Sequence, residues 1–168
     1  MTENCIPNSI DNEEIIYRTL YSPFHYDSKR GKVKPNAVEP PLKKPDDDDP
    51  TKANNKVSTI RKKYVSLLFC LEHAHKYEKD NKKFEGFLSL ITKDIKNAGA
   101  DIQAKPVEDN PAHANIVYSM LDLNLQEEVD QLTKAKLKET YTKIANSGKY
   151  IKKDIEQNQE FLASDAKE

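Results

Sequence analysis

Apolar and polar residues alternate in short blocks through the first two thirds of the chain, which predicts a mixed domain of strands and helices. Residues 15–21 are mostly β-branched and aromatic and stop before Pro23, as is typical of a strand. A polar segment follows, with a turn expected at Arg30-Gly31. The same reasoning predicts further strands at 57–60, 84–91, 100–107 and 113–120.

Two helices are expected between these strands. The apolar run at 64–79 is longer than ordinary strands, so it predicts a helix that is buried on most sides. Thr92 is placed to cap a short second helix, which Gly99 would close.

The last third has a different pattern. From Leu137 to Leu162 apolar residues recur mostly in steps of four and three, a heptad pattern typical of one or two long helices, with Gly148 as the expected break. Asn124 with Glu127 resembles an N-terminal capping arrangement. The apolar stripe fits either a helix packed on its own domain or one that docks on a partner.

Together these elements predict an α+β fold, with a small sheet of four to five strands, two helices and a C-terminal helical arm. We expect a disordered N-terminus at 1–12, an α+β domain at 13–120 and C-terminal helices at 121–168. Within the domain, segment 36–56 is rich in proline and carries aspartate at 46–49, so we expect an extended, solvated surface loop outside the core. The aspartates lack the spacing of a calcium loop.

Composition narrows the classes of function. The net charge of −1 argues against general nucleic-acid binding, which usually needs a large positive excess. Cys5 and Cys70 form no metal-ligand ladder, so we expect no metal site, one exposed thiol and one buried thiol. We also expect a cytoplasmic protein without a membrane segment, because no leader-like or spanning apolar stretch is visible.

Two turns that contain histidine are the candidate sites. His25 precedes a basic turn in which Lys29 and neighbouring cations surround Gly31, a composition suited to an anion. His113 follows a rigid Asn110-Pro111 turn at the start of a strand, where it is placed to act as an acid, a base or a ligand-binding donor. Both turns are also compatible with ordinary polar loops.

His73 and His75 are two residues apart. On a helix this spacing places them on different faces, so they are not expected to share a metal ion.

The stretches HYDSKRGKVKPNA, VS and DNPAHANI resemble a group of small uncharacterised bacterial proteins, over roughly residues 15–118. This resemblance implies a single unit followed by added C-terminal helices, and it assigns no function.

The order of Arg18 in a first strand, then Ser58 and Thr59 in a second strand, then a helix is similar to the arginine-then-STS order of ADP-ribosyltransferases. That resemblance implies NAD as substrate, with Arg18 at the pyrophosphate and Ser58 in the nicotinamide site. His113 or Glu108 would be the late catalytic residue.

Three functions follow from these patterns. The first is a binding module for an anionic small ligand or nucleotide, with contacts from the residues Arg18, His25, Lys29, Ser58, Asp109, Asn110 and His113. The second is an NAD-using enzyme similar to ADP-ribosyltransferases. The third is an antitoxin-like or immunity-like interaction module that binds a protein partner, or itself, through residues 125–162.

Overall fold

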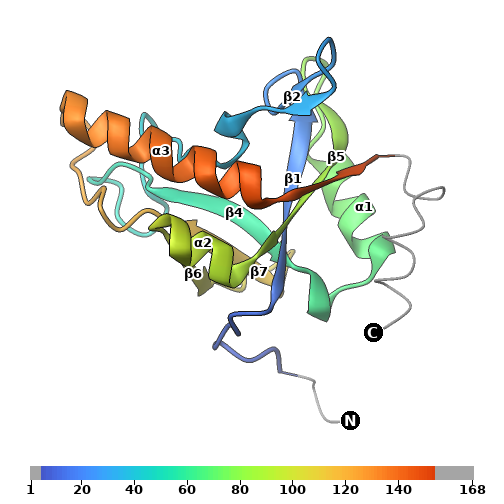
Figure 1. Cartoon of the computed structure of the whole chain (residues 1–168). Coiled ribbons are helices and arrows are strands. Elements are labelled where there is room, and N and C mark those ends of the chain that lie inside the picture. The colour runs from blue at the N-terminus through green and yellow to red at the C-terminus, as the bar shows by residue number, and fades with distance from the viewer. Residues whose placement is uncertain (1–4, 154–168) are drawn as a thin grey trace.

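A six-stranded antiparallel sheet forms the centre of the computed structural model, which describes residues 5–153. The strands lie in the order β6-β7-β4-β1-β5-β8, with β4 and β1 in the middle (Figure 1). Their bounds are β1 (Ile15–Ser22), β4 (Lys56–Arg61), β5 (Lys83–Ile91), β6 (Asp101–Ala104), β7 (His113–Val117) and β8 (Lys149–Lys152). A separate hairpin consists of β2 (Tyr26–Asp27) and β3 (Lys32–Val33).

Three α-helices pack on this sheet in the described part of the chain. They are α1 (Leu67–Lys76), α2 (Thr92–Ala98) and α3 (Gln131–Ser147), with short 3-10 turns η1 (Pro35–Val38) and η2 (Lys62–Tyr64). The predicted α+β class is therefore confirmed. The expected four to five strands were too few, because β8 and the β2–β3 hairpin were not foreseen, whereas α3 lies within the predicted C-terminal helical arm.

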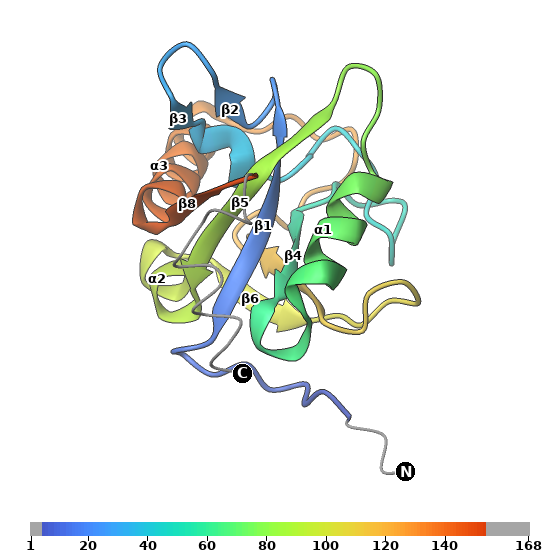
Figure 2. The ribbon, with the colours of Figure 1, turned by 90° about the vertical axis from the view of Figure 1, so that its right-hand side faces the viewer.

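The helices cover both faces of the sheet, with α1 on one side and α2 and α3 on the other (Figure 2). Side chains alternate along β1. Ile16 and Leu20 therefore join the core under α2, α3 and η1. Tyr17 and Tyr21 join the core under α1.

Strands β1 and β4 pair over only a short distance. Their register joins Ile16 to Arg61 and Tyr17 to Ile60, and no pairing continues beyond this point. From Arg18 onward β1 pairs with β5 alone. The two central strands thus diverge, and the space between them is where the candidate site lies.

The prediction that the C-terminal segment is helical holds up to Gly148 and is wrong directly after it. Gly148 does end α3, as expected, but the chain then forms β8 on the free edge of β5. A Cβ atom on Gly148 would lie 2.6 Å from Leu88 Cδ1, so only glycine allows this close approach to the sheet. Ile151 is buried as part of β8, whereas Leu162 lies outside the described residues.

The predicted surface loop at 36–56 begins inside the core. Ala37 and Val38 are fully buried, so the prediction that this whole segment lies outside the core is wrong. Asp46 is also buried, and its Oδ1 lies 2.6 Å from Lys56 Nζ, so the aspartate run is not uniformly solvated.

Helix α1 was expected to be buried on most sides, which is wrong. Cys70 and Ala74 face the sheet and are buried, whereas Leu68 is 63% exposed. One face of α1 is therefore covered and the other faces solvent. The prediction of a buried and an exposed thiol is confirmed, since Cys5 is exposed.

Two predicted helix caps were misplaced. Thr92 does not cap α2, because its hydroxyl donates to the Glu14 carbonyl at 3.0 Å, although Gly99 closes the helix in the left-handed region as expected. Glu127 accepts from the Asn124 N–H, but α3 begins later, with Asp130 as its N-cap.

Candidate functional site

Two adjoining cavities flank the divergence of β1 and β4. The first, here called the loop cavity, has a volume of about 310 Å³ and lies between β1, β4, α1 and the segment 107–113. The second, here called the basic cavity, has a volume of about 570 Å³ and is lined by the start of the β2–β3 region and by segments 36–58 and 79–82. Arg18, Ser58 and Lys82 line both cavities, which therefore meet at these residues.

Arg18 is held in place by two backbone carbonyls. Its Nε donates to Ala37 O at 2.7 Å and its Nη1 donates to Ser58 O at 3.1 Å. A guanidinium has five N–H donors, so three remain without a protein acceptor in the described part of the chain. Burial lowers the pKa of Arg18 to about 10, and the group therefore stays cationic at neutral pH. No described carboxylate forms an ion pair with it.

Lys82 adds a second cation to the same wall. Its Nζ lies 4.3 Å from the centre of the Tyr21 ring, and none of the described carboxylates pairs with it. Burial, and then the positive charges of Arg18, Lys79 and Lys44, lower the pKa of Lys82. Like charges are thus gathered here without an ion-pair partner among the described residues.

The lining of the basic cavity is strongly positive. Glu39 is the single carboxylate among the described residues that line it, against the five cationic side chains of Arg18, Lys44, Lys56, Lys79 and Lys82. Lys56 is neutralised by Asp46. The other four cations leave a net positive surface in this hollow, which favours an anion.

His25 lies on the basic cavity as a hydrogen-bond donor. Its Nδ1 accepts the backbone N–H of Tyr21 at 3.1 Å, so the proton of the neutral ring is on Nε2. Burial, followed by the charges of Arg18, Lys82 and Lys34, lowers the pKa of His25 to about 3. The imidazole is therefore neutral at pH 7.

His113 has the opposite tautomer and lines the loop cavity. Its Nδ1 lies 2.7 Å from Lys105 O, and because a carbonyl only accepts, Nδ1 carries the proton. Nε2 is then an acceptor. Burial lowers the pKa of His113, which keeps this nitrogen unprotonated at neutral pH.

Asn110 is the most unusual residue of the loop cavity. It is 1% exposed, and its Oδ1 accepts the Ala112 N–H at 3.1 Å. Its Nδ2 is the one buried side-chain polar atom of the described residues that has no hydrogen-bond partner. A buried donor without an acceptor is costly, so this amide is a strong indication of a site.

Asp109 ties the segment 107–113 to helix α1. Its Oδ2 accepts from Tyr77 Oη at 2.5 Å and from Lys76 Nζ at 3.0 Å. These two hydrogen bonds lower the pKa of Asp109 to about 2, so the carboxylate is ionised. The contact holds one side of the loop cavity in place.

The structure brings together most of the residues predicted from the sequence. Five of them line the loop cavity, namely Arg18, Ser58, Asp109, Asn110 and His113. His25 lies across the shared wall in the basic cavity, so the two histidines are in adjoining cavities and not in one. Lys29 and Glu108 are exposed and line neither cavity.

Sequence reasoning missed Lys82, His73 and Tyr77, which also line the loop cavity. His73 and Tyr77 are four residues apart on one face of the α1 region, and their rings lie 5.0 Å apart. That spacing was a usable signal. Lys82 lies in a lysine-rich turn, where the sequence does not distinguish it from its neighbours.

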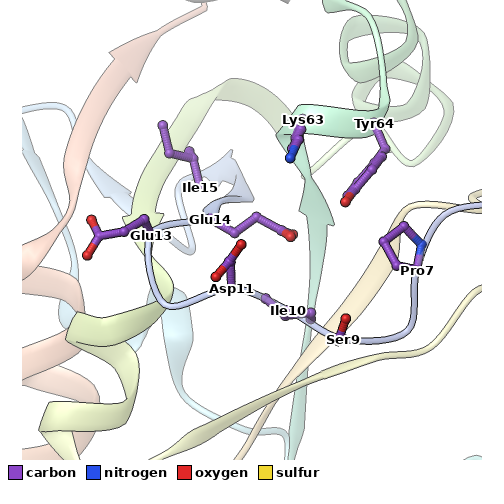
Figure 3. Close-up of a pocket in the computed structure, with 9 residues that line it drawn as sticks. All are labelled: Pro7, Ser9, Ile10, Asp11, Glu13, Glu14, Ile15, Lys63 and Tyr64. Atoms are coloured by element: carbon purple, nitrogen blue, oxygen red, sulfur yellow. The ribbon is translucent and has the colours of Figure 1, made fainter.

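A third cavity, of about 620 Å³, lies between segment 7–15 and η2 (Figure 3). Arg61, which precedes η2, donates to the carbonyls of Pro7 and Ser9 and to the Glu14 carboxylate, with Nε 2.7 Å from Oε2. Glu13 turns away from the other labelled side chains and pairs with a lysine of α2. Two of the three carboxylates that line this cavity, Glu13 and Glu14, already have protein partners, so we place no ligand here.

In the described region, no group of three or more His, Cys, Asp or Glu side chains is arranged to hold a metal ion. No helix there is both long enough and apolar enough to cross a bilayer. Comparison of the chain with family models, with curated proteins and with solved structures finds no match.

Proposed function

We propose that this protein is a binding module for an anionic small ligand, whose negative group lies between Arg18 and Lys82. The observation that carries the proposal is the pair of cations at the junction of the two cavities, without a carboxylate partner among the described residues. Three unused N–H donors on Arg18 match the geometry of a phosphate or carboxylate.

The surroundings of this pair support the same ligand chemistry. Lys44 and Lys79 extend the positive surface along the basic cavity. His25 presents a neutral ring with Nε2–H, a donor that does not itself add charge. A bound anion would relieve the repulsion among these cations, and binding would stabilise the folded state by mass action.

Thermal unfolding with pyrophosphate tests the proposal. Pyrophosphate should raise the midpoint of the wild type, and Lys82→Ala should weaken its binding by about tenfold or more. Lys29→Ala is the matched control, since it removes an exposed lysine that lines neither cavity. Equal affinities for the wild type and both variants would rule out the junction as the anion site.

One observation also favours the second function, an enzyme similar to ADP-ribosyltransferases. Arg18 and Ser58 are direct neighbours across the diverging strands, as that resemblance implies. Glu108 lies outside both cavities, so Asp109 is the carboxylate that lines the loop cavity among the described residues, together with the histidines His73 and His113. Turnover of NAD that is lost in Arg18→Ala would favour the enzyme over the binding module.

The third function is partner binding through residues 125–162, of which 154–162 lie outside the described residues. Ile144 and Ile151 belong to the apolar stripe that would make this contact. Ile144 is fully buried and Ile151 is nearly so, and both pack within the same chain. Replacing them would therefore test folding and not partner binding.

A further inference from the structure

Segment 107–113 forms one wall of the loop cavity, and this wall carries a specific pattern of hydrogen-bonding groups. The orientation of the Asn110 amide is fixed, because Oδ1 accepts the Ala112 N–H and the flipped amide would place two donors together. Nδ2 therefore remains the unpaired donor. Asn110 lines the loop cavity, and no protein group among the described residues accepts a hydrogen bond from Nδ2.

Two acceptors lie on the same wall as this donor. His113 Nε2 is unprotonated because Nδ1–H is used by the Lys105 carbonyl. The Asp109 carboxylate is ionised and keeps an oxygen, Oδ1, that is not used by the Tyr77 and Lys76 hydrogen bonds. The wall thus combines one donor with two acceptors.

A group that fits this wall has a carbonyl beside an N–H. The carbonyl would accept from Asn110 Nδ2, and the N–H would donate to His113 Nε2 or to Asp109. Uracil, guanine and primary carboxamides all have such an edge. A site built to pair with buried polar groups discriminates strongly against molecules that lack them.

We infer that the ligand is an organic phosphate whose other end carries an amide-type edge, with the phosphate at Arg18 and Lys82 and the edge at Asn110. This inference rests on the proposed anion site and adds the identity of the uncharged end. The loop cavity is lined by Arg18 and Lys82 as well as by Asn110, so a single small molecule can contact all three. The basic cavity would take any further phosphate groups.

Calorimetric titration of the full chain with four probes tests the inference. Pyrophosphate reports on the anion site alone, and ribose 5-phosphate adds a sugar without the edge. Uridine monophosphate adds a nucleobase with N–H between two carbonyls, and nicotinamide mononucleotide adds a carboxamide. We expect one of the last two to bind at least tenfold more tightly than ribose 5-phosphate, and which of them does so identifies the source of the edge.

Two variants locate the effect. Asn110→Ser keeps an oxygen for the Ala112 N–H but removes the Nδ2 donor, so it should abolish the tenfold preference and leave pyrophosphate binding unchanged. Thr19→Met places a longer side chain on the β1 wall of the loop cavity, breaks no hydrogen bond of the structure, and should have the same effect. Thr19→Met decides the matter if Asn110→Ser fails to fold.

The possible outcomes distinguish a failure of this inference from a failure of the proposed anion site. Equal binding of all organic phosphates, or a preference that survives both variants, would overturn the inference and leave the anion site standing. Absence of binding by pyrophosphate and by every other probe would overturn both.

Discussion

The environment of His25 leads to a quantitative prediction about pH. The folded protein holds the pKa of His25 at about 3, because the ring is buried beside Arg18 and Lys82. In the unfolded chain the ordinary value of about 6.5 applies. Below pH 6.5 the unfolded state therefore binds a proton that the folded state does not bind until about pH 3. The contribution of His25 to the free energy of unfolding is therefore complete above pH 6.5 and decreases as the pH falls toward 3.

The size of the effect follows from the pKa difference. At pH 5 the solution is about 1.5 pH units below the pKa of the unfolded imidazole. At 1.36 kcal/mol per unit, this lowers the free energy of unfolding by about 2 kcal/mol. His25 is partly exposed, so we reduce this figure to about 1 kcal/mol to allow for solvent screening.

The matched variant is His25→Asn, whose side-chain oxygen can accept the Tyr21 N–H but does not titrate. Urea unfolding at pH 7 and pH 5 would give the free energy of unfolding of both proteins. The wild type should lose about 1 kcal/mol more than the variant between these values. His73 and His113 also have lowered pKa values, but they contribute equally to both proteins. Identical losses of the free energy of unfolding in the wild type and in His25→Asn would contradict the low pKa of His25 in the folded protein.

Three further predictions concern the frame around the site. Glu14→Ala leaves Arg61 buried without its carboxylate and should cost about 3–5 kcal/mol in urea unfolding; a cost below about 1 kcal/mol would contradict the burial of this pair. Gly86→Ala would place a Cβ 2.2 Å from Ile151 O, at a backbone φ of +152°. The variant should therefore lower the free energy of unfolding by about 1–3 kcal/mol and speed the hydrogen exchange of the β8 amides. Unchanged exchange would be evidence against the β5–β8 pairing. Asp130→Ala removes the N-cap of α3 and should cost about 0.5–2 kcal/mol by thermal unfolding, whereas no change would place the start of the helix elsewhere.

Local patterns were enough to predict most of the central elements. Alternation and β-branched residues correctly indicated β1, β4, β5 and β7, and Gly99 marked the end of α2. Strand β8 was missed because Ile151 continues the helical spacing of α3 beyond Gly148. Its pairing with β5 depends on a distant segment, which a local period does not report.

The candidate site was predicted in part for the same reason. The turn at 109–113 was recognisable because its polar residues are adjacent in the sequence and Pro111 makes it rigid. It contains Asp109, Asn110 and His113. Lys29 was predicted as a contact because it belongs to the basic turn around Gly31, and Lys82 was not considered. The position of Lys82 beside Arg18 arises only when β5 pairs with β1, and charge composition alone does not indicate it.

A crystal structure of the protein with bound pyrophosphate would test the central claim most directly. The account predicts phosphate oxygens within hydrogen-bonding distance of the free Arg18 N–H groups and of Lys82 Nζ, where the loop cavity and the basic cavity meet. Pyrophosphate bound only to exposed lysines such as Lys29, with the junction empty at saturating concentration, would contradict it.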